Sequence, residues 1–157
     1  LAVVAPENLD RVADFAIGKY EVTFEEWEAC ARDGGCLSNP HPNDQGWGRE
    51  RRPVINVSWN DAQEYVLWLS ARTGQTYRLP SDAEWEYADN APRDYNTPEG
   101  RTMRSERDPP EGQGTVPVGS HEPNFSGLHD KSGNVSEWVQ DEWRTEYRVQ
   151  RGLSWGR

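Results

Sequence analysis

The sequence predicts an α+β fold in which short helices and short strands are joined by much irregular backbone. Three segments carry helix start signals followed by apolar residues at helical spacing, and six short segments are rich in aromatic and β-branched residues. Two stretches, 37–52 and 89–115, have the proline, glycine and charge content of long loops. The length suits a single domain over residues 1–157.

The first elements precede residue 36. Segment 15–23 is a predicted strand, and a helix is predicted over 23–35. Thr23 begins that helix, because Glu26 three positions later completes a capping box. Gly34 and Gly35 end it, since glycine adopts the left-handed conformation of a helix stop at little cost.

The segment 58–74 has the clearest helical periodicity, with apolar side chains three and four positions apart at Ala62, Tyr65, Val66 and Leu69. Ser58 or Asn60 caps its start, and Gly74 ends it.

The third predicted helix, 81–90, begins with a second capping box made by Ser81 and Glu84. It places Trp85 and Ala88 on one face for burial, and we expect it to end near Pro92.

The other predicted strands are 52–59, 76–80, 115–120, 134–143 and 148–155. The loop 89–115 is unusually long for a compact domain. Such a loop is functional or is held by something other than secondary structure, and a metal ion is one candidate.

Composition excludes some classes of protein. Seventeen basic and twenty-seven acidic side chains give a net charge of −10, which argues against nucleic acid as a partner. No stretch approaches the roughly 20 apolar residues that span a bilayer, so we expect no membrane-spanning segment. Only 34% of residues are hydrophobic, yet there are eight tryptophans, six tyrosines and three phenylalanines. Aromatic side chains must therefore supply much of the core.

The two cysteines, Cys30 and Cys36, bracket "CARDGGC". Their spacing permits a small disulfide loop in an oxidising compartment, and two free buried thiols are the alternative.

"GLHDKSGNVSEWVQDEW", residues 127–143, places an acidic loop before a predicted strand. Gly133 permits a sharp turn that aims the carbonyls of Gly133 and Val135 at one point, between Asp130 and Glu137. Two carboxylates and two carbonyls form a hard-oxygen set that suits calcium. The alternative is a plain turn in which Asp130 is a cap and Glu137 is solvated.

Other chemistry is sparse. The three histidines have no metal-ligand spacing, and we interpret them as surface residues: His41, His121 and His129. Arg78 and Arg151 each precede a turn, and we expect them to pair with buried acids such as Glu84 or Glu86.

Four blocks resemble, in order and spacing, the formylglycine-generating-enzyme (sulfatase-modifying factor) domain family: "FAIGKYEVTFEEWEAC", "RRPVINVSWNDAQEYVLWLSARTGQTYRLPSDAEWEYA", "PVGSHEPNFSGLHDKSGNVSEWVQDEW" and "RVQRGLSW". The resemblance implies an irregular, C-type-lectin-like fold of low regular secondary structure, with two to three short helices and short antiparallel strands. It also implies bound Ca²⁺, held by the side chains of Asp130 and Glu137 and the carbonyls of Gly133 and Val135.

The resemblance carries over no catalytic residue. Formylglycine-forming members oxidise a substrate cysteine with O₂ and copper held by two cysteines downstream of an "RGGSW" block, which here reads "RGLSWGR". Cys30 and Cys36 lie in the first helix region and do not match that pair. The histidine-rich iron site of ergothioneine-type relatives lacks its ligands as well, so neither copper nor iron is supported. Leu153 and Ser136 also depart from the family pattern.

We therefore expect a calcium-stabilised binding or accessory subunit of a larger assembly, without the catalytic cysteines. The alternatives are a fragment of a true oxidase or oxygenase of the family, and a lectin-like or hypervariable receptor. On this resemblance the domain is truncated at both ends, which would leave strand edges or apolar faces uncovered. Either further residues or a protein partner is expected to cover the C-terminal edge. Calcium, a disulfide and an acidic surface together favour an extracytoplasmic location, either periplasmic or secreted.

Overall fold

The computed structural model describes residues 4–6, 15–89, 114–124, 126–131, 133–144 and 147–152. These ranges contain the elements β1 (Val4–Pro6), β2 (Phe15–Ile17), α1 (Phe24–Arg32), α2 (Trp59–Thr73), α3 (Asp82–Asp89), β3 (Glu137–Arg144) and β4 (Tyr147–Arg151). The α+β class with short helices and short antiparallel strands is confirmed. The predicted loop 89–115 lies outside the described residues apart from its two ends.

The predicted start of α1 is confirmed. The Glu26 N–H donates to the Thr23 hydroxyl at 3.3 Å, and the Glu26 carboxylate accepts from the Thr23 N–H at 2.8 Å. Gly34, with φ 79°, follows the helix in the left-handed conformation. Local sequence therefore sets both ends of this helix.

The N-cap of α2 is Ser58 rather than Asn60. The Ser58 hydroxyl accepts from the Asp61 N–H, while the Asp61 carboxylate accepts from the Ser58 N–H at 2.7 Å. Gly74 caps the other end with φ 73°. The carboxylate at Asp61 is what selects Ser58, because a reciprocal cap needs an acceptor three positions after it.

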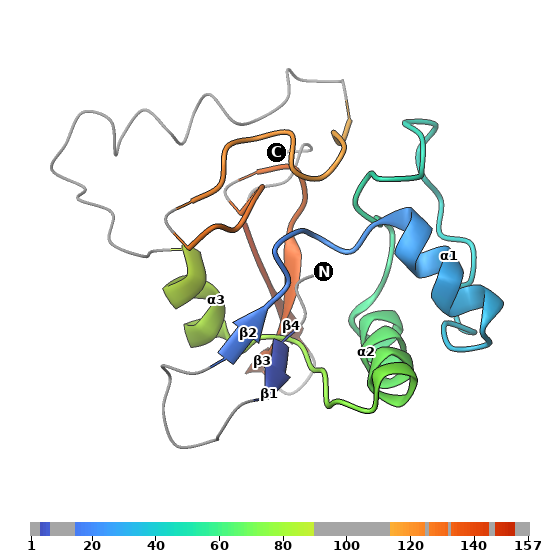
Figure 1. Cartoon of the computed structure of the whole chain (residues 1–157), viewed down its shortest axis with the longest axis horizontal. Helices are drawn as coiled ribbons and strands as arrows, with labels where there is room; N and C mark the ends of the chain where they lie inside the picture. The colour runs from blue at the N-terminus through green and yellow to red at the C-terminus, as the bar shows by residue number, and fades with distance from the viewer. Residues whose placement is uncertain are drawn as a thin grey trace, which may run out of the picture.

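The core lies between α1 and α2, which pack together on one side of the molecule (Figure 1). Trp27 is fully buried and stacks on Tyr65 of α2, with ring centroids 5.5 Å apart. A disulfide joins Cys30 to Cys36, with 5.5 Å between their Cα atoms. Both cysteines are fully buried, so the bond ties the end of α1 to this core.

α3 lies on the other side, against the β3–β4 hairpin (Figure 1). Its predicted capping box is confirmed, with the Glu84 carboxylate accepting from the Ser81 N–H at 2.7 Å. Trp85 and Ala88 are buried as predicted. The predicted end near Pro92 lies outside the described residues, which stop at Asp89 on this side.

The two predicted arginine pairs have different outcomes. Arg78 holds Glu84 through two hydrogen bonds of 2.7 Å, as predicted. Arg151 instead forms a two-pronged pair with Asp82, which links the end of β4 to the first turn of α3. The prediction of Glu84 or Glu86 for Arg151 was wrong, because Arg78 already occupies Glu84 and only the tertiary fold brings Asp82 to Arg151.

Both sheets are antiparallel pairs. β1 pairs with β2, with Val4 opposite Ile17, and β3 pairs with β4, with Glu137 opposite Arg151. The register of β3 and β4 shifts along the hairpin, so their pairing is irregular.

Segments 52–59, 76–80 and 115–120 form no strand, contrary to prediction. Each contains a proline, and proline cannot donate to a ladder. Left-handed residues at Asn56 and Gly119 bend the first and third. Isolated main-chain hydrogen bonds hold them instead, such as those from the Val54 N–H to the Val22 carbonyl at 2.8 Å and from the Val118 N–H to the Arg51 carbonyl at 2.9 Å.

Within the described residues, no helix has the length and apolar character that a bilayer crossing requires. This agrees with the expectation from sequence.

Replacing both Cys30 and Cys36 with alanine should lower the free energy of unfolding by about 2 kcal/mol, because the bond closes a short loop in the unfolded chain. Thermal denaturation followed by circular dichroism would measure this as a drop in Tm of roughly 4–8 °C. An unchanged Tm would show that the disulfide contributes nothing to stability.

Glu84→Gln should lower stability most at neutral pH. The hydrogen bond from Arg78 lowers the pKa of the Glu84 carboxyl, so its contribution is present above the ordinary carboxyl pKa and is lost as pH falls through the lowered one. Glutamine still accepts from the Ser81 N–H, which preserves the cap. The Tm difference from wild type should shrink between pH 7 and pH 3. The exposed Glu86→Gln on the same helix is the matched control, and a Tm difference independent of pH would contradict the assignment.

Candidate functional site

The predicted calcium turn, residues 130–137, leads directly into β3. Asp130 (φ 59°) and Asn134 (φ 64°) take the left-handed conformation, whereas sequence reasoning assigned the turn to Gly133. Asparagine and aspartate tolerate this region better than other side chains with a Cβ. The turn is therefore made by the two residues that also offer polar side chains.

Asn134 is fully buried and connects three segments. Its amide nitrogen donates to Glu21 at 2.7 Å, and its amide oxygen accepts from the Val116 N–H at 2.9 Å. Glu21 also accepts from the Val135 N–H at 3.3 Å. Sequence reasoning missed Glu21, because it lies in a predicted strand 113 positions before Asn134.

Glu21 is a buried acid with a raised pKa. Burial has the largest effect, and the negative charges of Glu137 and Asp130 raise the pKa further, against the hydrogen bond from Asn134. Three buried carboxyls, Glu21, Asp130 and Glu137, thus share one electrostatic environment.

Glu137 is buried with two donors on one carboxylate oxygen. The Lys131 ammonium nitrogen lies 2.5 Å from Oε2, and the Trp85 indole N–H donates to the same oxygen. Burial raises the pKa of Glu137, but the charge of Lys131 and these hydrogen bonds outweigh it and hold the pKa below its ordinary value. Glu137 is therefore neither solvated nor without a counter-charge.

Asp130 has both carboxylate oxygens engaged. Oδ2 accepts from the Gly119 N–H at 2.6 Å, and Oδ1 lies 2.7 Å from His121 Nδ1. His129 Nδ1 in turn lies 2.7 Å from the His121 carbonyl. The interpretation as surface histidines was wrong for these two, which are partly buried, and it holds for His41, which is exposed.

The structure turns the two predicted side-chain ligands, Asp130 and Glu137, toward different donors. Within the described ranges, no three His, Cys, Asp or Glu side chains are placed to hold a metal ion. The predicted set has only two carboxylates, and its other members are the carbonyls of Gly133 and Val135. Carboxylate and carbonyl oxygens are the donors that calcium prefers, whereas copper and zinc prefer nitrogen or sulfur, and both predicted carboxylates are buried.

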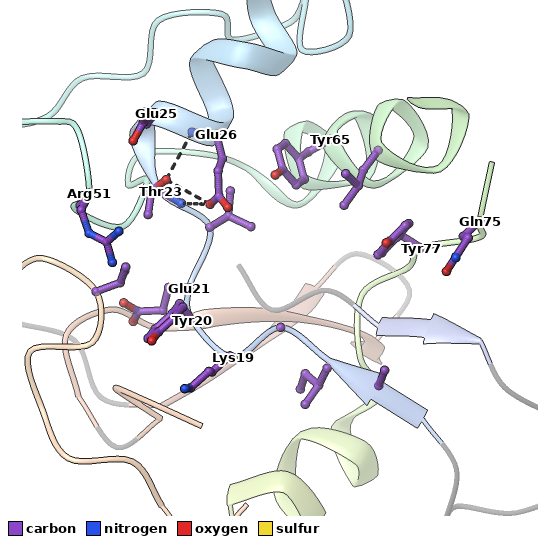
Figure 2. Close-up of a pocket in the computed structure, with 16 residues that line it drawn as sticks. Lys19, Tyr20, Glu21, Thr23, Glu25, Glu26, Arg51, Tyr65, Gln75 and Tyr77 are labelled. Atoms are coloured by element: carbon purple, nitrogen blue, oxygen red, sulfur yellow. Dashed lines mark hydrogen bonds between the residues drawn. The ribbon is translucent and has the colours of Figure 1, made fainter. Parts of the chain in front are cut away.

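A pocket of about 600 Å³ opens between the α1–α2 pair and the chain from Ala16 to Thr23 (Figure 2). Glu21 lines it, and its carboxyl also accepts from the main chain of the turn 130–137. Three tyrosine rings line it as well: Tyr20, Tyr65 and Tyr77. One residue therefore belongs to both the pocket wall and the turn.

Tyr65 is the distinctive side chain of this pocket. It is buried, and its hydroxyl makes no hydrogen bond within the described part of the chain. Figure 2 shows that hydroxyl on the side of Glu26. Burial and the charge of Glu26 raise the pKa of Tyr65. The Tyr65 hydroxyl is therefore available to hydrogen-bond a group that enters the pocket.

The cysteines take no part in either feature. Cys30 and Cys36 are the chain's two cysteines, and their disulfide leaves no free thiol in these 157 residues.

Comparison with known proteins identifies the family. A stretch of 118 residues is 35% identical to the formylglycine-generating enzyme of Thermomonospora curvata, and covers 64% of this chain and 37% of that enzyme. A stretch of 121 residues is 32% identical to the inactive C-alpha-formylglycine-generating enzyme 2 of Bos taurus, and covers 66% of this chain and 38% of that protein. The chain thus spans little more than a third of either relative.

The solved structure of PvdO from Pseudomonas aeruginosa matches with a TM-score of 0.66 and 25% identity, over 99% of this chain and 79% of PvdO. The model of the sulfatase-modifying factor enzyme 1-like domain matches residues 3–157. The chain therefore belongs to the formylglycine-generating-enzyme, or sulfatase-modifying factor, domain family.

Proposed function

We propose that this chain is a non-catalytic member of the family, acting as a calcium-stabilised binding or accessory domain of a larger assembly. The observation that supports it is that Cys30 and Cys36, the two cysteines within residues 1–157, are joined in a buried disulfide and do not match the copper-binding pair. Copper-dependent cysteine oxidation needs thiolate ligands, and a disulfide supplies none. Similarity to a relative whose name describes it as inactive also supports a non-catalytic role.

The tyrosine-lined pocket is the proposed binding surface. Its apolar walls suit a partly apolar group, and the Tyr65 hydroxyl beside Glu26 provides the polar contact that would orient it. Tyrosine suits this task because its ring and hydroxyl combine apolar area with hydrogen bonding.

Calcium is proposed to bind at the turn before β3, held by the Asp130 and Glu137 side chains and the carbonyls of Gly133 and Val135. A bound calcium ion would supply positive charge to a region where three carboxyls are buried. We further propose a protein partner along β4, which has β3 as its one strand partner among the described residues, and an extracytoplasmic location, which the disulfide supports.

A second candidate is that the chain is part of an active family oxidase. The identity of 35% to a formylglycine-generating enzyme favours it. This function requires two thiols that residues 1–157 do not contain in free form.

Incubation of the chain with copper, O₂ and a cysteine-containing peptide tests the main proposal. We expect aldehyde formation, measured by mass spectrometry, to remain at the level of a Cys30→Ala, Cys36→Ala control. Product above that level would reject the non-catalytic role and support the oxidase.

Calcium binding is tested by thermal denaturation with EDTA and with added CaCl₂. Saturation at about 100 times Kd should stabilise the wild type by about 2.7 kcal/mol, a rise of roughly 5–10 °C in Tm. Asp130→Asn and Glu137→Gln should abolish the rise, because each removes a ligand charge. The exposed Glu122→Gln is the control and should retain it. Identical calcium responses in the ligand variants and the wild type would reject these residues as ligands.

A further inference from the structure

One of the chain's two lysines is buried beside a proposed calcium ligand. Lys131 is 6% exposed, whereas Lys19 is exposed at the surface. A lysine is seldom buried unless its charge is paired, because removing an ammonium from water is costly. The surroundings of Lys131 must therefore compensate its charge.

Two side chains hold the Lys131 ammonium. Its nitrogen lies 2.5 Å from Glu137 Oε2 and 4.1 Å from the centre of the Trp85 ring. Trp85 also donates its indole N–H to the same carboxylate oxygen. The aromatic face and the carboxylate thus form a cation-binding arrangement that the chain's own lysine fills.

We propose that Lys131 is a tethered cation that competes with calcium for Glu137 and sets the calcium affinity of the turn; this inference rests on the proposed calcium binding. A calcium ion ligated by Glu137 must either displace the ammonium or lie close to it. Displacement breaks a buried ion pair, and close approach places like charges together in a poorly screened region. Both weaken calcium binding.

The same contact explains how the turn is held without calcium. Lys131 neutralises Glu137 from within the turn itself, six positions earlier in the chain. Removing the ammonium leaves a buried carboxylate without a counter-charge. A divalent ion bound to Glu137 would then supply the missing positive charge. Neutral variants of Lys131 are therefore expected to depend more on calcium, not merely to be less stable.

The test is the calcium Kd of the full chain, measured by isothermal titration calorimetry after EDTA treatment. Lys131→Gln keeps a hydrogen-bond donor toward Glu137 and removes the charge, so its Kd should fall roughly tenfold or more. Lys131→Arg keeps the charge and should bind calcium as weakly as the wild type. Lys19→Gln makes the same charge change at an exposed position, where solvent screens it, and should leave Kd unchanged.

Equal Kd values for the wild type and Lys131→Gln would reject the proposal that Lys131 competes with calcium, while the proposed calcium site itself would be retained. If neither protein binds calcium, both the proposed calcium site and the proposed competition by Lys131 are rejected. If Lys131→Gln does not fold in EDTA, recovery of its native circular dichroism on adding calcium, at concentrations below the wild-type Kd, supports the proposal. Failure to recover with calcium would overturn it, and Lys131→Met provides a second neutral variant for the same comparison.

Discussion

The buried carboxyl of Glu21 is the contact on which the arrangement of this domain depends. It accepts from the side chain of Asn134 and from the Val135 N–H, across more than a hundred positions of sequence. The segment that carries Glu21 leads into α1, and the turn that carries Asn134 leads into β3. This contact therefore joins the helical side of the molecule to the hairpin side (Figure 1), and it joins the tyrosine-lined pocket to the turn.

Charge compensation around that contact dominates the energetics of the site. Three buried carboxyls lie within one electrostatic environment, and the charge of each is compensated in a different way. Glu21 has a raised pKa that favours its neutral form, Asp130 is held by a main-chain N–H and His121, and Glu137 is paired with Lys131. A buried charge is tolerated only with such partners, so the turn keeps its shape through ion pairing as much as through packing.

Tryptophan helps so irregular a chain close around its core. The indole N–H groups of Trp27, Trp59 and Trp138 donate to main-chain carbonyls of Asn39, Val139 and Val57 at 2.9 to 3.0 Å. Each ring contributes apolar area while its nitrogen satisfies an acceptor in a segment outside its own element. These hydrogen bonds connect separate segments of the chain, as strand pairing does in folds with longer strands.

The sequence by itself determined the helix starts and the family, because capping boxes, glycine stops and motif blocks act over a few neighbouring residues. Thr23, Ser81 and Gly74 take their predicted roles for this reason. Only the tertiary structure decided that Glu21 joins the site as a third buried acid, that Arg151 pairs with Asp82, and that Lys131 neutralises Glu137. Burial and ion pairing depend on which segments that are distant in sequence come into contact. The local residue pattern does not determine those contacts.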